Sequence, residues 1–154
     1  MIVVSDTSAI TALLQIGQAE LLSALYGNVF IPEAVRNELT ATHTQLPNFI
    51  RVVPVADNAY CARLLQELDA GEAEAIVLAK ETKADNLLMD ELDGRRVAMR
   101  EGVHVIGLLG VVLEAKLRGL IPSAIKISER LEREAHFHVA DSIKETIYRA
   151  AGEL

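Results

Sequence analysis

The chain has 154 residues, 51% of them hydrophobic, and a formal net charge of −7. This length and composition exclude a disordered protein and predict one domain over residues 1–154, since the chain is too short for two domains of ordinary size. The acidic balance argues against a general nucleic-acid-binding protein, which usually carries a basic face.

No apolar stretch approaches the roughly 20 residues that cross a bilayer, because the longest candidate, residues 103–113, contains His104 and is followed by Glu114. The first residues form an apolar run without a basic segment before it, so no signal peptide is predicted. The single cysteine, Cys61, cannot form an intrachain disulfide and is expected in the core. These features predict a cytoplasmic protein without a membrane role.

Strand and helix patterns alternate along the first part of the chain. Gly17 and Gly27 are typical helix stops, Pro32 suits the first turn of a helix, and Pro54 favours an edge position for its strand. The predicted elements are, in order, a strand at 2–4, helices at 7–16 and 18–26, a strand at 29–31, a helix at 32–39, a loop at 40–50 and a strand at 51–55.

The alternation continues in the second part. We expect helices at 58–68 and 71–83, a central strand at 87–89, a helix at 95–100, a strand at 103–106 and helices from 108 to the end. The helix at 71–83 is apolar almost all round, which predicts burial. Strands that alternate with helices imply a parallel sheet with right-handed crossovers. The predicted class is α/β, with a central parallel sheet flanked by helices and a helical C-terminal third.

Two aspartates stand just after predicted strands. Asp6 follows the strand at 2–4, and Asp90 follows the strand at 87–89. The carboxyl ends of parallel strands meet at one edge of the sheet, where ligands bind, so we expect these two side chains close together. Asp6 can also cap the helix that follows. Because the next two residues, Thr7 and Ser8, can supply that cap instead, a functional role for Asp6 is favoured.

Two glutamates lie in predicted helices beside apolar residues. For Glu38, a place at the solvated margin of its helix is an equal alternative. Glu72 starts a buried helix, where the helix dipole favours a carboxylate, and a helix charge without chemical role is its alternative. Glu74 lies about 200° from Glu72 around that helix. Both cannot face one metal ion, and Glu72 is preferred.

Four converging carboxylates repel one another, and a bound divalent cation is the usual reason to tolerate this. Oxygen donors favour Mg2+ or Mn2+ over zinc. A cation held by Asp6 and Asp90 would activate a water and reverse the local charge, so the acidic balance does not exclude a nuclease. Arg95, Arg96 or Lys116 could hold flanking phosphates, although a solvated helix charge explains each equally well.

Other classes of protein fit the acids less well. A response-regulator receiver needs adjacent acids after its first strand, and a haloacid-dehalogenase-type phosphatase needs Asp-x-Asp, whereas residues 6–8 read Asp-Thr-Ser. The four histidines form no competing ligand set. A non-catalytic module that keeps the acids for folding or for protein binding stays open.

The acids stand in four characteristic segments, residues 3–10 (VVSDTSAI), 35–39 (Val-x-x-Glu-Leu), 71–79 (GEAEAIVLA) and 87–90 (LLMD). Taken together, these segments resemble the PIN-domain nucleases, with matching order and spacing over residues 2–110. The form of residues 71–79 and the later residues 114–122 resembles an uncharacterised prokaryotic subfamily related to VapC-type toxins. The resemblance implies a PIN-like three-layer fold.

The resemblance also implies a Mg2+- or Mn2+-dependent endoribonuclease, with RNA as the substrate and a toxin of a toxin–antitoxin pair as one biological role. Carried over by position, the catalytic and metal-binding residues would be Asp6, Glu38, Glu72 and Asp90. Secondary candidates are Ser8, Glu74 and Asp93. The third acid is usually aspartate in the family, which leaves the choice between the two glutamates open. An antitoxin protein and a second copy of the chain, in a homodimer, are the further partners considered.

Overall fold

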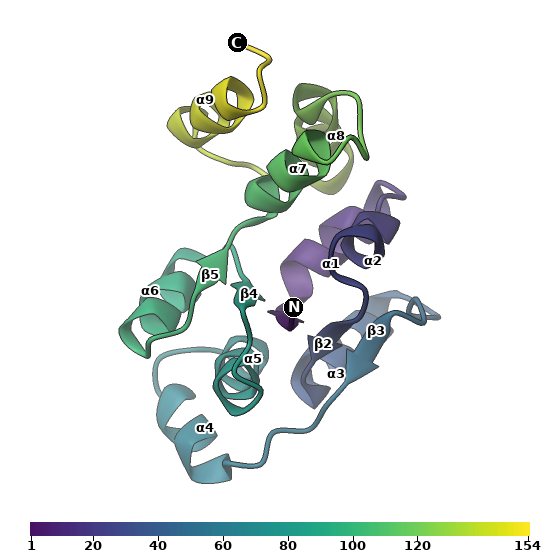
Figure 1. Ribbon diagram of the computed structural model, residues 1–154. Helices are drawn as coiled ribbons and strands as arrows, with labels where there is room; N and C mark the ends of the chain where they lie inside the picture. Colours follow the sequence, from purple (N-terminus) through teal and green to yellow (C-terminus); the bar gives the residue numbers. More distant parts are fainter.

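The computed structural model describes residues 1–154 and has a five-stranded sheet at its centre (Figure 1). The strand order is β3-β2-β1-β4-β5, and every neighbouring pair is parallel, as the sequence predicts. The strands are β1 (Val3–Ser5), β2 (Val29–Ile31), β3 (Ile50–Val52), β4 (Asn86–Leu88) and β5 (Val105–Ile106). The two strands that precede the predicted aspartates, β1 and β4, are neighbours.

Helices cover both faces of this sheet (Figure 1). They are α1 (Thr7–Gln15), α2 (Glu20–Tyr26), α3 (Glu33–Thr42), α4 (Asn58–Leu64), α5 (Ala70–Glu81), α6 (Leu92–Arg100), α7 (Leu108–Leu117), α8 (Ala124–Ala135) and α9 (Asp141–Ala150). One layer contains α1, α2 and α7, with α8 and α9 beyond them, and the other contains α4, α5 and α6. Helix α3 packs against both α5 and α1. None of the helices is long and apolar enough to cross a membrane.

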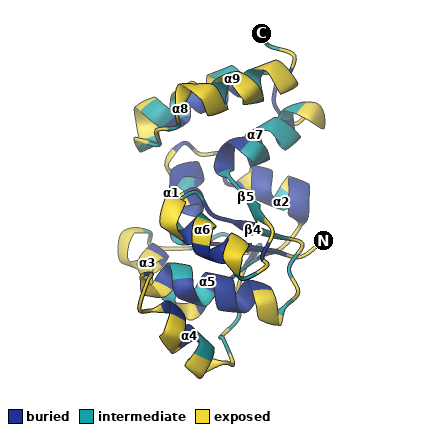
Figure 2. Cartoon of the chain, turned by 90° about the vertical axis from the view of Figure 1, so that its left-hand side faces the viewer, coloured by how far each residue is buried: buried dark blue, intermediate teal, exposed yellow.

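The strands divide the core into two clusters of apolar side chains. Val3 and Leu88 belong to the larger cluster, whereas their neighbours Val4 and Leu87 belong to the smaller one. Successive side chains of a strand point to opposite faces, which explains this division and the three layers. Helix α5 is buried along most of its length, while α9 has no buried residue (Figure 2). Cys61 is buried, as expected.

The predicted element types are correct, but several boundaries differ. Helix α3 continues to Thr42, the strand predicted at 51–55 is residues 50–52, and the strand predicted at 103–106 is only residues 105–106. Helix α4 ends at Leu64 instead of residue 68. Helix α6 begins at Leu92 instead of residue 95. Its first turn contains an acidic residue, which the positive end of the helix dipole stabilises.

The pairing of β1 with β4 brings the ends of these strands to the same edge of the sheet. Ser5 lies opposite Leu88, and the backbone N–H of Asp6 donates to the carbonyl of Leu88 at 3.1 Å. Parallel pairing therefore places Asp6 and Asp90, which follow the two strands, on one side of the molecule.

Candidate active site

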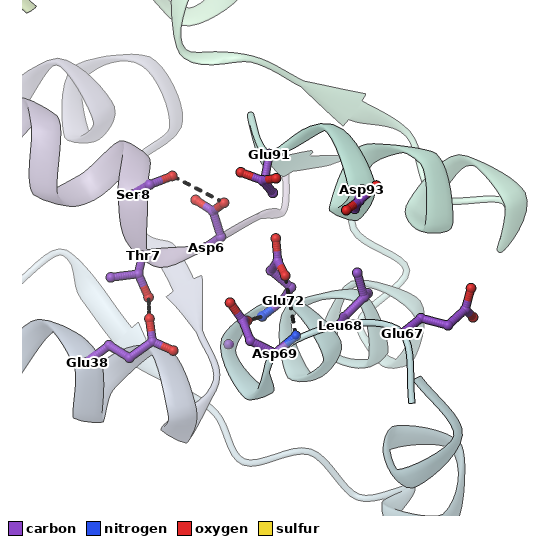
Figure 3. Close-up of a pocket in the computed structure, with 11 residues that line it drawn as sticks. Asp6, Thr7, Ser8, Glu38, Glu67, Leu68, Asp69, Glu72, Glu91 and Asp93 are labelled. Carbon is purple, nitrogen blue, oxygen red and sulfur yellow. Dashed lines mark hydrogen bonds between the residues drawn. The ribbon is translucent and has the colours of Figure 1, made fainter. Parts of the chain in front are cut away.

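A cavity of about 320 Å³ opens where α1, α3, α5 and α6 meet (Figure 3). We call it the acidic cavity, because seven of its eleven lining residues are acids and none is Lys or Arg. These acids are Asp6, Glu38, Glu67, Asp69, Glu72, Glu91 and Asp93. Three of the four predicted site residues thus line one cavity. The fourth, Asp90, lines an adjoining cavity of about 600 Å³, which shares Ser8 and Glu91 with the first.

Asp6 is buried, with 4% of its surface exposed, and it is the N-cap of α1. The expectation that the hydroxyl residues after it supply this cap is wrong, because the extended backbone at Asp6 places its own carboxylate over the first turn of the helix. That carboxylate accepts only two hydrogen bonds, from the Ala9 N–H and the Ser8 hydroxyl, both at 3.5 Å. Such long bonds compensate little of the cost of burying the charge.

The surroundings of Asp6 and Asp90 favour their protonated forms. Burial, followed by the negative charge of Asp90, raises the pKa of Asp6 to about 7. Burial also raises the pKa of Asp90 to about 6, against the opposing effects of the Leu108 N–H and the Arg95 charge. The two carboxyl groups therefore titrate close to neutral pH, and a bound cation would favour their ionised forms.

Asp90 connects the strand edge to α7. Both of its carboxylate oxygens accept a hydrogen bond from the Leu108 N–H, at 3.1 and 3.0 Å. Gly107 makes this approach feasible, because a Cβ there would lie 2.9 Å from an Asp90 oxygen and 2.9 Å from an Arg95 nitrogen. The first residue of α7 thus holds the Asp90 carboxylate in its orientation, and the charge of this carboxylate raises the pKa of Asp6.

Glu72 belongs to a capping box at the start of α5. Asp69 accepts a hydrogen bond from the Glu72 N–H at 2.9 Å, and Glu72 Oε1 accepts one from the Asp69 N–H at 3.4 Å. Burial, with the charge of Asp69 added, raises the pKa of Glu72. Its carboxylate points toward Asp6 in Figure 3. The spacing Asp-x-x-Glu signals such a box in the sequence, although our sequence analysis did not use it.

Glu38 reaches the cavity from α3. Its Oε2 accepts a hydrogen bond from the Thr7 hydroxyl at 2.7 Å. A Cβ at Gly71 would lie 2.5 Å from the other oxygen of Glu38. The absence of a side chain at Gly71 therefore makes room for Glu38. The local sequence does not reveal the contributions of Thr7 and Gly71, because they depend on how α3 packs against α1 and α5.

The secondary candidates are distributed differently. Ser8 is exposed and lines the acidic cavity beside Asp6. Asp93 lies at the rim, with an exposed side chain 4.0 Å from Arg96. Glu74 is not among the lining residues, because it points away and accepts a hydrogen bond from the Ala34 N–H. The helical geometry that favoured Glu72 over Glu74 thus agrees with their placement.

Of the basic residues considered for phosphate binding, Lys116 is engaged elsewhere. It donates to the carbonyl of Pro122 at 2.9 Å and lies 3.4 Å from the carboxylate of Glu153. Arg95 lines the cavity that contains Asp90.

Two of the outer acids have basic partners, whereas the four inner acids form no ion pair. Arg100 lies 2.8 Å from Glu67, and Arg96 lies 4.0 Å from Asp93. No ion pair within 4.0 Å involves any of the four predicted site residues, Asp6, Glu38, Glu72 and Asp90. These four carboxylates therefore have no ion-pair partner, and the one basic charge that acts on Asp90 is that of Arg95.

The chemistry of this inner group fits a hard divalent cation, since all donors are carboxylate oxygens. The side chains are not already gathered around one point, because no three acidic, histidine or cysteine residues form a metal-binding group. Glu38 and Glu72 each hold a hydrogen bond instead. The remaining coordination positions of a cation between Asp6 and Asp90 would therefore be filled by water, or by a glutamate that leaves its present hydrogen-bond partner.

Comparison with known proteins agrees with this architecture. A family model described as a PIN domain matches residues 2–153, a range that includes all four inner acids. No curated protein matches the chain.

Proposed function

Because the chain belongs to the PIN-domain family, whose members are in general metal-dependent nucleases, we propose that it is a Mg2+- or Mn2+-dependent endoribonuclease. The reaction is the hydrolysis of RNA phosphodiester bonds, in the cytoplasm. One observation carries the proposal. Asp6 is a buried carboxylate with two long hydrogen bonds and no ion pair, and it lies beside Asp90 at the ligand-binding edge of a parallel sheet.

In this proposal Asp6 and Asp90 hold the cation, with Glu38 and Glu72 as further ligands. When bound, the cation would supply an activated water and neutralise a phosphate oxygen. The Leu108 N–H fixes the orientation of Asp90. Ser8 lies at the cavity surface next to Asp6, where its hydroxyl can donate to a phosphate oxygen. Asp93 is an outer acid, and Glu74 has no part in the chemistry.

The test is cleavage of a mixed RNA pool with Mn2+, with Mg2+ and with a chelator. We expect metal-dependent cleavage by the wild type. Asp6→Asn and Asp90→Asn should each reduce cleavage by more than the roughly 10–100-fold that loss of an outer-shell partner costs. Asp57→Asn is the matched control, because Asp57 also caps a helix through its side chain but does not line the acidic cavity. Near-normal activity of either site variant would rule out the assignment.

One observation favours a second candidate, a non-catalytic PIN-like module that binds protein and retains a metal site. Glu38 and Glu72 are held by hydrogen bonds instead of converging on one point. This candidate predicts stabilisation of the wild type by Mn2+ without cleavage of any RNA in the pool, which is the outcome that separates it from the nuclease.

We further propose that the nuclease is the toxin of a toxin–antitoxin pair. A small protein inhibitor would place an arginine in the acidic cavity, where a guanidinium pairs bidentately with carboxylates. Such an inhibitor should compete with Mn2+, because both neutralise the same charges. Co-purification from the native host, followed by titration of the complex with Mn2+, tests this role. Failure to recover a protein partner, together with normal growth on overproduction, would contradict it and leave the nuclease proposal standing.

A further inference from the structure

Three cavities share Ser8 as a lining residue, and we call the three together the branched groove. Ser8 lines the acidic cavity, the 600 Å³ cavity that contains Asp90, and a third cavity of about 460 Å³ beside α1. Phe137 lines the second and third cavities but not the first. It therefore stands between the two branches that lead away from the acidic cavity.

Phe137 is held in place by the end of α8. His136 closes that helix in the left-handed conformation, with φ at 53°, and the Phe137 N–H donates to the carbonyl of Leu131 at 3.0 Å. Part of the Phe137 side chain packs on the larger core cluster, and the rest is exposed. It is the only Phe, Tyr or Trp that lines any of the three cavities. The fold thus presents one anchored aromatic side chain to the groove.

The cavity between Asp90 and Phe137 is chemically two-sided. Half of its fourteen lining residues are hydrophobic, and most of these come from residues 137–140 and from α9. Its polar lining includes Asp90 and Arg95, and it shares Ser8 and Glu91 with the acidic cavity. The volume of about 600 Å³ is typical of a pocket for a small organic group. The arrangement suits an occupant in which a flat, apolar ring is joined to a phosphate.

A nucleotide is such an occupant. On the proposed function, we propose that Phe137 is a positioning residue that stacks on an unpaired base next to the scissile phosphate, with that base in the cavity between Phe137 and Asp90. The phosphate then lies on the side of Ser8 and Asp90. A base within a duplex has both faces covered by its neighbours, so only a single-stranded segment can make this contact. The groove therefore selects single-stranded RNA and sets which bond reaches the acids.

The test separates stacking from packing by substitution at Phe137. Phe137→Leu keeps an apolar side chain without an aromatic face, and Phe137→Trp keeps the aromatic face. Phe49→Leu is the matched control, because Phe49 is also partly buried against the same core cluster but lines none of the three cavities. Binding of a fluorescently labelled, short single-stranded RNA is measured in the Asp6→Asn background, in which the proposed function predicts no cleavage.

We expect Phe137→Leu to weaken binding of this RNA by about tenfold, the usual effect of losing one base–aromatic stack. Phe137→Trp and Phe49→Leu should bind like the parent. In the otherwise wild-type protein, Phe137→Leu should raise KM more than it lowers kcat. An RNA with an abasic site at the stacked position should lose as much affinity as Phe137→Leu, and the two changes together should cause no further loss.

Three results would overturn the inference. The first is unchanged RNA binding by Phe137→Leu, including the case in which that variant instead releases a co-purified protein, since the groove would then be a protein interface. The second is an equal loss of binding to duplex RNA of the same sequence, which would assign Phe137 to packing. The third is that an abasic site at no position of the RNA reproduces the loss of affinity seen for Phe137→Leu. Failure of the proposed function is seen separately, as absence of metal-dependent cleavage by the wild type.

Discussion

Asp6 combines a structural and a proposed chemical role in one side chain. As the N-cap of α1 it accepts a hydrogen bond from the first turn, and as a buried carboxylate beside Asp90 it has no ion-pair partner. A cap contributes about 1 kcal/mol. The burial and repulsion that raise the pKa of Asp6 to about 7 act in the opposite direction. Replacing this residue therefore changes the stability of the metal-free protein in a pH-dependent way.

The first prediction concerns this pH dependence. The folded protein keeps a proton on Asp6 up to about pH 7 and on Asp90 up to about pH 6, whereas both ionise near pH 3.8 when unfolded. Between these limits the folded state binds more protons, so the contribution of both groups to the free energy of unfolding falls as pH rises. For Asp6 the fall is at most about 4 kcal/mol. Urea denaturation in a chelator at pH 5 and pH 8 measures the part of this fall that lies above pH 5.

Other carboxylates also titrate in this window, so Asp6→Asn provides the reference. The free energy of unfolding of the wild type should lose more between pH 5 and pH 8 than that of Asp6→Asn. Equal pH dependence in the two proteins would show that the Asp6 carboxylate titrates normally.

The second prediction concerns Gly71, which leaves space for Glu38. In Gly71→Ala the new Cβ would lie 2.5 Å from a Glu38 oxygen and displace that carboxylate from the cavity. Ala favours a helix over Gly by about 1 kcal/mol, so the melting temperature should stay equal or rise while Mn2+ affinity falls. Calorimetric titration with Mn2+ measures the affinity. Gly110→Ala is the control, since its Cβ would meet Ile106 instead of an acid, and an equal loss of affinity there would contradict the explanation.

At the scale of helices and strands, local pattern predicted the elements that place the acids. The apolar runs before Asp6 and Asp90 gave the two central strands, and parallel pairing then put the acids on one edge. The same pattern did not reveal that α6 begins at Leu92 or that α3 packs closely on α5 at Gly71. Such contacts depend on segments that are distant in the chain, and local periodicity contains no information about them.

Like the fold, the candidate site could be predicted from the sequence only in part. Residue type and helical spacing distinguished Glu72 from Glu74, whose side chains point to different parts of the protein. The side chains that hold the acids in place, such as Thr7 for Glu38 and the Leu108 N–H for Asp90, were not predictable, because each comes from a different element. The role of the four acids as ligands stays a prediction.

The third prediction concerns the capping box of α5. Asp69→Ala should cost about 1 kcal/mol of stability, the usual effect of losing an N-cap, because it removes the acceptor of the Glu72 N–H. It also removes a carboxylate that lines the acidic cavity beside Glu72. Asp57→Ala removes the same kind of cap from α4, away from the acidic cavity. Urea denaturation should give similar losses for both, whereas Mn2+ titration should change only for Asp69→Ala. Identical Mn2+ binding by both variants would contradict a link between the box and the cavity.

At the scale of the whole molecule, the acidic residues around the acidic cavity fall into two groups. Outer acids such as Glu67 pair with arginines, while the inner group has no such partner. A net charge of −7 is thus compatible with a nuclease, because the acids without an ion-pair partner lie where a cation is proposed to bind. That residues 1–154 act as a single domain, and that two copies form a homodimer, stay predictions.

The fourth prediction is that Mn2+ stabilises the whole protein. A ligand that binds only the folded state at a hundredfold excess over its Kd adds about 2.7 kcal/mol, or roughly 5–10 °C for a chain of this size. Thermal melts with and without Mn2+, started from metal-free protein, measure the shift. Asp90→Asn should lose most of it, and Asp57→Asn should retain it. An unchanged melting temperature of the wild type at saturating Mn2+ would refute the proposed metal site.

The hydrogen bonds from the Leu108 N–H to Asp90 have a consequence for communication across the molecule. One carboxylate faces Asp6 and also anchors the start of α7, the helix against which α8 and α9 pack. A cation that draws the Asp90 carboxylate toward itself would weaken the hydrogen bonds from the Leu108 N–H. If cation binding moves the start of α7, a ligand of α8 and α9 that senses this movement changes cation affinity by the same factor by which the cation changes the affinity for that ligand. Such a ligand would act on the proposed site without entering the groove.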